Sequence, residues 1–316
     1  MITKSLLHRR SVLQIATSGL AIQMPKMGEA TRAVGQTSRL RLGGPVQTAY
    51  QSPEQWVSLL QGLGYSAAYC PVNDAKDETL LRAYQQAAGK ANIVIAEVGA
   101  WSNPMAPEEG ERQKALEKCQ AQLYLAERIG ARCCVNISGS RGNPWAGHHP
   151  QNLTGETFDL IVATTRAIID AVKPTRTFYA LETMPWSYPD SADSYLRLIK
   201  AVDRKSLAAH LDPVNLVSSP QLYYSSGDLI RDCFKKLGPY IKSCHAKDIT
   251  MSQKQNVHLD EIIPGQGNLD YRTYLQELNR LDDVPLMLEH LRTPEEYRQA
   301  AEYIRSVARE LGLSFR

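Results

Sequence analysis

Short apolar runs alternate with longer amphipathic stretches from about residue 38 to the end of the chain. Nearly continuous apolar runs are typical of parallel strands that are covered on both faces. We identify eight such runs: Leu40–Pro45, Ser66–Pro71, Asn92–Ala100, Arg132–Ser140, Thr177–Trp186, Leu207–Asn215, Ile241–Ile249 and Pro285–Leu291.

The segments between these runs carry helix signals. Ser52-Pro53-Glu54-Gln55 combines an N-cap serine, a proline at the first helical position and a capping-box glutamine, and Thr293-Pro294-Glu295-Glu296 repeats the pattern. Ser225-Ser226-Gly227-Asp228 is a weaker helix start, while residues 108–130 and 154–172 are long amphipathic stretches.

Eight strands that are each followed by a helix predict a single-domain α/β fold, the (β/α)8 TIM barrel, over residues 37–316. The main alternative is a doubly wound open sheet. Such a sheet normally has a glycine-rich phosphate-binding loop after its first strand, and Leu42-Gly43-Gly44-Pro45 does not match that pattern. The pattern therefore favours the barrel.

Polar residues end four consecutive predicted strands of this barrel. Glu182, Asp212, His245 and Glu289 are about one strand–helix repeat apart, at the end where barrel enzymes have their active sites. Three carboxylates crowded together would repel one another, and a divalent cation turns that repulsion into coordination. We therefore predict one metal site, best suited to Mn²⁺, Co²⁺ or Mg²⁺ and compatible with Zn²⁺. The alternative is that each residue is a separate strand-end cap or salt-bridge partner.

Five motifs at these strand ends resemble those of the xylose isomerase-like barrels, the sugar phosphate isomerase/epimerase family. They are Leu181-Glu182, Leu211-Asp212-Pro213, His245-Ala246-Lys247-Asp248, Pro264-Gly265-Gln266-Gly267-Asn268-Leu269-Asp270 and Leu288-Glu289. The resemblance implies the same four metal ligands, with Glu182 and Glu289 also acting as catalytic acid/base groups. It implies a divalent-metal-dependent sugar isomerase/epimerase that acts on a keto- or hydroxy-sugar through an enediolate intermediate.

The sequence departs from the ketose 3-epimerases of that family at two places. Asn215 replaces the histidine usual three residues after the aspartate ligand, and Ile249–Gln253 lacks the usual arginine. Two other functions therefore stay open, a lyase that performs β-elimination on a 3-keto-glycoside and a non-catalytic exported sugar-binding barrel. A phosphodiesterase like endonuclease IV needs more histidines at the site than His210 and His245, and it needs a basic groove for DNA.

Further side chains are predicted to bind the substrate because they lie at strand ends or on the inward face of a strand: Lys247, Glu97, Asn136, His210, Trp101 and Trp186. Lys247 shares the face of His245, and the tryptophans offer flat surfaces to sugar C–H groups. Each has a structural alternative: a salt bridge for Lys247, core packing for His210 and loop packing for the tryptophans. The same alternation turns His290 toward a helix.

Composition mainly limits the choice of partner. The chain is 43% hydrophobic and 22% charged with a net charge of +3, which suits a globular domain and is too small to imply nucleic acid. No run of 18 apolar residues suggests a membrane span. The six cysteines fit neither a zinc ribbon nor a disulfide scaffold. We expect a small-molecule carbohydrate as partner, and a homo-oligomer stays open.

The first 36 residues differ from the rest. His8-Arg9-Arg10-Ser11 precedes the moderately apolar stretch Val12–Met24, which is typical of an export signal. The paired arginines resemble the twin-arginine type, and no cysteine for a lipid anchor follows. We therefore expect residues 1–36 to be a signal and linker that direct the protein to the periplasm. The alternative is a disordered or surface-helical tail on a cytoplasmic protein.

Replacing Arg9 and Arg10 together by lysine should retain the protein in the cytoplasm, because the twin-arginine route reads the guanidinium pair. Cell fractionation followed by immunoblotting measures this. Unchanged export in a strain that lacks the twin-arginine machinery would rule out this route.

Overall fold

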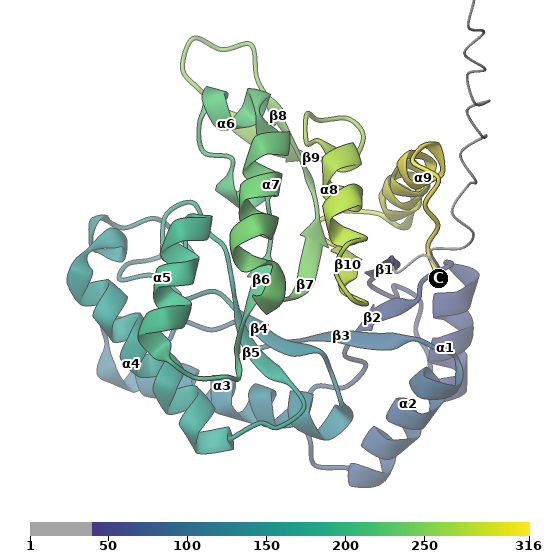
Figure 1. The fold of residues 1–316 in the computed structure, drawn as a ribbon. Coiled ribbons are helices and arrows are strands. Elements are labelled where there is room, and N and C mark those ends of the chain that lie inside the picture. The colour runs from purple at the N-terminus through teal and green to yellow at the C-terminus, as the bar shows by residue number, and fades with distance from the viewer. Residues whose placement is uncertain (1–39) are drawn as a thin grey trace, which may run out of the picture. The chain divides into compact units, whose positions relative to one another are not determined.

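The computed structural model describes residues 40–316, all of which belong to one compact unit (Figure 1). The predicted export segment lies outside the described residues. Eight parallel strands close into a barrel in the order β1-β10-β7-β6-β5-β4-β3-β2, which confirms the predicted (β/α)8 fold. The strands are β1 (Arg41–Gly44), β2 (Ala67–Tyr69), β3 (Val94–Gly99), β4 (Cys133–Asn136), β5 (Phe178–Glu182), β6 (Leu207–Leu211), β7 (Ile241–Ala246) and β10 (Pro285–Leu288).

Helices follow the strands and surround the barrel (Figure 1). They are α1 (Pro53–Gly62), α2 (Glu78–Lys90), α3 (Glu109–Ile129), α4 (Gly155–Val172), α5 (Ala192–Val202), α6 (Pro220–Tyr224), α7 (Ser226–Leu237), α8 (Tyr271–Leu278) and α9 (Pro294–Glu310). The predicted caps are confirmed, since the Ser52 side chain accepts from Gln55 N and that of Thr293 accepts from Glu296 N. Within residues 40–316, no helix combines the length and apolarity that a membrane crossing requires.

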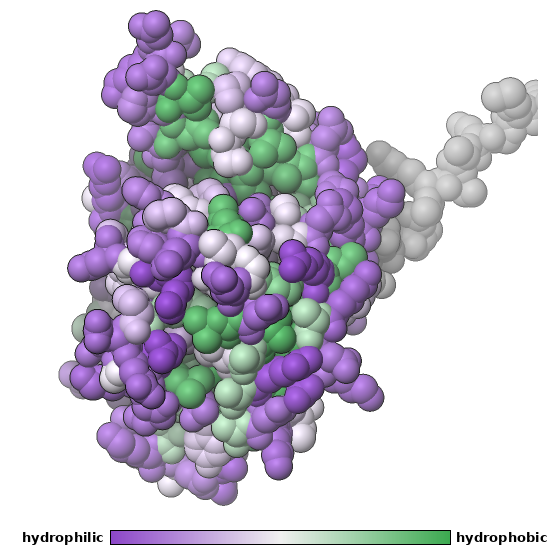
Figure 2. All heavy atoms as spheres, turned by 90° about the vertical axis from the view of Figure 1, so that its left-hand side faces the viewer, coloured by the Kyte–Doolittle hydropathy of each residue, from purple (hydrophilic) through white to green (hydrophobic). Residues whose placement is uncertain are grey.

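The barrel interior changes from apolar to polar along the strands. Small or apolar side chains such as Ala180, Ala208 and Met287 are fully or almost fully buried. Two residues further along the same strands or just past them, the inward positions are Glu182, His210 and Glu289. The outer surface on the α4 and α5 side is largely polar, with apolar patches between the polar side chains (Figure 2). Inside the barrel, the polar side chains thus gather at the carboxyl-terminal ends of the strands.

A β-hairpin follows β7 where the sequence pattern predicted a strand continuing to Ile249. Its strands are β8 (Asp248–Met251) and β9 (Leu259–Ile262), which pair antiparallel, and α6 lies beside β8 (Figure 1). The prediction was wrong at this point because the apolar pattern continues across the strand end while the chain leaves the barrel. The hairpin brings Glu261 to the barrel mouth.

Asp248 anchors this hairpin to the loop that returns to the barrel. Its buried carboxylate accepts backbone N–H groups of Ile249 at 2.8 Å, Gly265 at 2.8 Å, Gly267 at 3.1 Å and Leu269 at 2.9 Å. Gly265 has φ +97°, and a Cβ on Gly267 would lie 2.2 Å from Asp248 Oδ1. The glycines of the Pro-Gly-x-Gly motif are thus required by backbone geometry and close approach.

Replacing Asp248 by asparagine should lower the free energy of unfolding by about 2 kcal/mol, because an amide keeps only one acceptor oxygen for four donors. Urea denaturation measures the change. Asp260→Asn, at an exposed position of the same hairpin, is the control and should change stability by less than about 0.5 kcal/mol. Equal stability of the two variants would show that the carboxylate does not hold the hairpin.

Candidate active site

The four predicted ligands come together at the mouth of the barrel. One side-chain ligand atom from each of Glu182, Asp212, His245 and Glu289 lies within 4.8 Å of the others. The strand register accounts for this, because His210 pairs with both Glu182 and Ser243, which sets Asp212 beside His245. Met287 pairs with His245, so Glu289 follows two residues beyond. The stagger of a closed barrel brings these successive steps to one rim.

His245 is at the centre of the cluster. Its Nδ1 atom lies 2.8 Å from Glu289 Oε1, 3.1 Å from Glu182 Oε1 and 3.7 Å from Asp212 Oδ2. Asp212 Oδ2 and Glu289 Oε1 are buried and take part in ion pairs, but neither accepts a hydrogen bond of good geometry from the described residues. Buried oxygens with spare acceptor capacity around one imidazole nitrogen fit a divalent cation.

Lys247 balances the negative charge at this rim. Its Nζ atom lies 2.8 Å from Asp212 Oδ2, 3.2 Å from Glu289 Oε1 and 3.1 Å from Glu261 Oε1. Burial lowers the pKa of Lys247, but the carboxylates, Asp212 first, outweigh it and hold that pKa well above its ordinary value. Lys247 faces the site, as the strand alternation predicted. It also forms salt bridges, which was the alternative to substrate binding.

The two glutamates of the cluster differ in their electrostatic surroundings. Burial raises the pKa of Glu182 above its ordinary value, although His245 acts in the opposite direction. Burial also raises the pKa of Glu289, but His245 and then Lys247 outweigh it and hold this pKa below its ordinary value. The two carboxyl groups therefore differ in proton affinity because His245 and Lys247 act more strongly on Glu289.

Asn215 bridges two members of the site. Its Nδ2 donates to Glu182 Oε1 at 3.0 Å, and its Oδ1 accepts from Lys247 Nζ at 2.9 Å. This is the position at which the chain departs from the ketose 3-epimerases. The amide orients a carboxylate and an ammonium at once, because it offers a donor and an acceptor from one rigid group.

A second layer lies beneath the cluster. Glu97 Oε2 is 3.4 Å from His245 Nε2, while Glu97 Oε1 is 3.5 Å from His210 Nδ1 and accepts from the Ser243 hydroxyl. The rings of His210 and His245 meet edge to face at a centroid distance of 4.0 Å. Burial lowers the pKa of His210 to about 4, which keeps this imidazole neutral at pH 7.

This layer favours one tautomer of His245. A neutral His245 with its proton on Nε2 would direct it toward Glu97, 3.4 Å away, and leave Nδ1 free to ligate a cation. Glu97 was predicted to bind a substrate hydroxyl, but it is 2% exposed and its contacts are with the two histidines and Ser243. The geometry favours a positioning role for it.

Asn136, also predicted to bind substrate, is fully buried against the loop that follows β3. Its Oδ1 accepts from Ser102 N at 3.1 Å, and its Nδ2 donates to Ser102 O at 3.2 Å. The amide therefore fixes the loop that follows β3. The prediction for Asn136 used strand position alone. Strand position cannot distinguish a side chain that faces the substrate from one that faces a neighbouring loop.

A cavity of about 580 Å³ opens above the cluster. Glu182, Glu289, Asn215 and Lys247 line its floor, and the two predicted tryptophans Trp101 and Trp186 are in its wall. Sequence reasoning missed four further wall residues: Tyr69, Trp145, Glu261 and Tyr297. Trp145 and Glu261 come from a loop and from the unpredicted hairpin, where strand periodicity carries no information.

His290 also lines the cavity, whereas the alternation rule turned it toward a helix. The prediction was wrong because β10 ends at Leu288 and His290 has φ +58°, so the strand period no longer applies. Its Nδ1 lies 2.9 Å from Glu261 Oε2.

The sequence of residues 48–307 matches the family described as Xylose isomerase-like TIM barrel. No curated protein matches the chain. Among solved structures, 3-keto-D-glucoside 4-epimerase from E. coli has a similar fold, with 13% identity and a TM-score of 0.59 over 84% of this chain and 99% of that chain.

Two other solved structures show how varied proteins with this fold are. A xylose isomerase-like TIM barrel protein from Mycobacterium smegmatis in complex with magnesium has 16% identity and a TM-score of 0.60, over 86% of this chain and 96% of that chain. Endonuclease IV from Thermus thermophilus has 15% identity and a TM-score of 0.65, over 85% of this chain and 99% of that chain. At these identities the likeness concerns the fold alone. The family match covers most of the chain and includes every strand that carries a member of the cluster. The protein therefore belongs to the xylose isomerase-like TIM barrel family.

Proposed function

We propose that the protein is a divalent-metal-dependent isomerase or epimerase that acts on an unphosphorylated keto- or hydroxy-sugar. The observation that carries this proposal is the placement of Glu182 and Glu289. Both line one cavity, they come from β5 and β10, and these strands are three places apart around the barrel. Two carboxyl groups that enter one cavity from separate strands can remove and return a proton on a substrate bound between them.

Glu182, Asp212, His245 and Glu289 would hold the metal. Three carboxylate oxygens and one imidazole nitrogen suit Mn²⁺, Co²⁺ or Mg²⁺, and they also accept Zn²⁺. A bound cation would supply Lewis-acid stabilisation of the negative charge that develops on the substrate oxygens when a proton leaves the neighbouring carbon. His245 would use Nδ1 as ligand while Glu97 accepts its Nε2–H.

The remaining steps belong to side chains of the cavity. One glutamate takes the proton from the carbon next to the carbonyl, which gives an enediolate, and the other returns a proton. Inversion of a stereocentre results when the return occurs on the opposite face, and carbonyl transposition results when it occurs at the neighbouring carbon. Lys247, which Asn215 holds in place, lies where it can donate to a substrate oxygen.

The charge of the cavity supports a sugar without phosphate. Among the described residues, its only basic side chains are Lys247 and His290, and both are paired with carboxylates. Three glutamates, Glu182, Glu261 and Glu289, line the same space. A phosphate dianion would be repelled there, while the aromatic wall offers flat apolar faces to sugar C–H groups. Export, which the paired arginines predict, would agree with such a substrate.

Metal binding should depend on Glu289 but not on its neighbour Glu261. Glu289→Gln should weaken Mn²⁺ binding by more than about 100-fold, since even outer partners of metal ligands contribute roughly 10–100-fold. Glu261→Gln, the same change on the same cavity wall, should stay within about threefold because Glu261 is not part of the cluster. Isothermal titration calorimetry measures both. Equal affinities would refute the ligand assignment.

Catalysis should require both carboxylates. Glu182→Gln and Glu289→Gln should each lower kcat by about 10²–10⁴-fold with the fold intact, because each removes an acid/base group. The assay incubates the Mn²⁺-loaded protein with ketoses and 3-keto-glucosides in D₂O and measures deuterium at carbon by NMR. Deuterium with inversion or carbonyl transposition is expected. Loss of a leaving group would identify a lyase instead, and wild-type turnover undiminished after metal removal would contradict the mechanism.

A further inference from the structure

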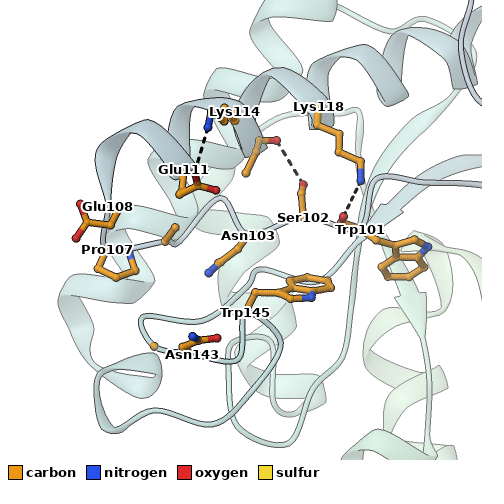
Figure 3. Close-up of a pocket in the computed structure, with 13 residues that line it drawn as sticks. Trp101, Ser102, Asn103, Pro107, Glu108, Glu111, Lys114, Lys118, Asn143 and Trp145 are labelled. Atoms are coloured by element: carbon orange, nitrogen blue, oxygen red, sulfur yellow. Dashed lines mark hydrogen bonds and ion pairs between the residues drawn. The ribbon is translucent and has the colours of Figure 1, made fainter.

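A second cavity adjoins the catalytic one. Its volume is about 650 Å³, and it shares Trp101 and Trp145 with the catalytic cavity. Figure 3 shows helix α3 with Glu111, Lys114 and Lys118 on one side and the loop of Asn143 and Trp145 on the other. Trp101 lies at the end opposite Pro107 and Glu108 (Figure 3). The proposed reaction does not use this space.

We propose that this outer cavity binds a second sugar ring, so that the substrate is a disaccharide-like glycoside whose reacting ring occupies the catalytic cavity. The inference rests on the proposed function, whose substrate class it narrows. Both volumes fall in the range of small-molecule sites, roughly 300–1,000 Å³. The two shared tryptophans make the cavities direct neighbours, and a ligand of two linked rings would pass over these indoles.

Trp101 at the junction is held in position by helix α3 and by the end of strand β3. Lys118 Nζ donates to Trp101 O at 2.9 Å. A Cβ on Gly99 would lie 2.3 Å from Trp101 Nε1, so the indole lies against bare backbone that only glycine provides. With 39% of its surface exposed, Trp101 keeps a face open to a ligand. Trp145 is exposed to the same extent, so both shared tryptophans offer apolar surface to a ligand.

Hydrogen bonds also join the loops that form the two walls. Asn103 Nδ2 donates to Ser140 O at 2.8 Å, and Asn103 Oδ1 accepts from Ser140 N at 2.9 Å. Trp186 Nε1 donates to Ala146 O at 2.9 Å, which ties the wall of the catalytic cavity to the loop of Trp145. The outer cavity is therefore built in advance of any ligand, which reduces the entropy lost on binding.

The side chains of the outer cavity suit a sugar better than an aromatic group. Glu111 and Lys114 form an ion pair of 3.2 Å on an exposed turn of α3, and Glu108 and Asn143 add further polar groups. A pyranose ring presents hydroxyl groups at its edge and C–H groups on its faces. The polar side chains can hydrogen-bond to the hydroxyl groups, and Trp145 can pack against the C–H groups. A purely aromatic group would contact the apolar surface of Trp145 but would make no hydrogen bonds to these exposed polar side chains.

The test compares binding of disaccharides and methyl glycosides to the Mn²⁺-loaded protein by calorimetry. The probes are cellobiose, maltose and sucrose, together with methyl β-glucoside, methyl α-glucoside and 4-nitrophenyl β-glucoside. We expect at least one disaccharide to bind about tenfold more tightly than its methyl glycoside. The double variant Glu111→Ala/Lys114→Ala should remove this advantage and leave the affinity for methyl glycosides unchanged. Both residues line the outer cavity, and neither lines the catalytic one.

The control variant is Gln113→Ala/Glu117→Ala, which removes another exposed side-chain pair from the same helix. It should keep the preference for the disaccharide. Equal binding of disaccharides and methyl glycosides by the wild type would overturn the proposal. The proposal would also be overturned if 4-nitrophenyl β-glucoside bound more tightly than methyl β-glucoside and the double variant kept this difference. An aromatic group would then be the occupant of the outer cavity.

Binding separates this proposal from the proposed function. If the double variant loses the disaccharide preference while the wild type turns over no keto-sugar in D₂O, the outer sugar site is supported and the isomerase function fails. If turnover occurs but disaccharides gain nothing over methyl glycosides, the function is supported and the outer sugar site is refuted.

Discussion

The burial of three carboxylates at one end of the barrel is the constraint on which the site depends. Glu182, Asp212 and Glu289 are held together by strand register. Glu182 and Asp212 are buried, and the Glu289 side chain is 13% exposed. Buried anions are costly unless cations and hydrogen bonds compensate them. Lys247, His245 and Asn215 provide that compensation from three directions. A divalent cation bound among these carboxylates would also compensate their negative charge, and it would act as a Lewis acid.

This constraint also organises what surrounds the cluster. Glu97 reaches His245 from below, where the interior is dry, and Glu261 reaches Lys247 from the hairpin above. The hairpin in turn depends on Asp248, whose four backbone donors close the loop behind it. The charged centre is thus supported from below by the buried Glu97, which does not line the cavity, and from above by a hairpin whose Glu261 does.

Much of the fold and the four-residue cluster could be predicted from sequence because both follow from periodicity. A strand of a closed parallel barrel is apolar throughout, and its last inward residue faces the site, so Glu182 and Asp212 were identifiable without coordinates. The same rule failed at His290, where a positive φ ends the period. It gave no information on Trp145 and Glu261, which belong to a loop and to a hairpin outside the barrel.

Asn215, one of the two departures from the ketose 3-epimerases, now has a physical explanation. Asn215 joins Glu182 to Lys247, which a histidine could do only in one protonation state. The tryptophans at the mouth line both cavities, and they do so from loops that hydrogen bonds hold in place. Loop residues of this kind determine which substrate a common barrel accepts.

The central claim is that the cluster binds one divalent cation through a single imidazole. Pulsed electron paramagnetic resonance of the Mn²⁺-loaded protein measures the nitrogen nuclei coupled to the metal. The account predicts one Mn²⁺ per chain with one coupled histidine nitrogen, and loss of that coupling in His245→Gln while His210→Gln retains it. Absence of nitrogen coupling in the wild type, or a second coupled histidine that His210→Gln removes, would contradict it.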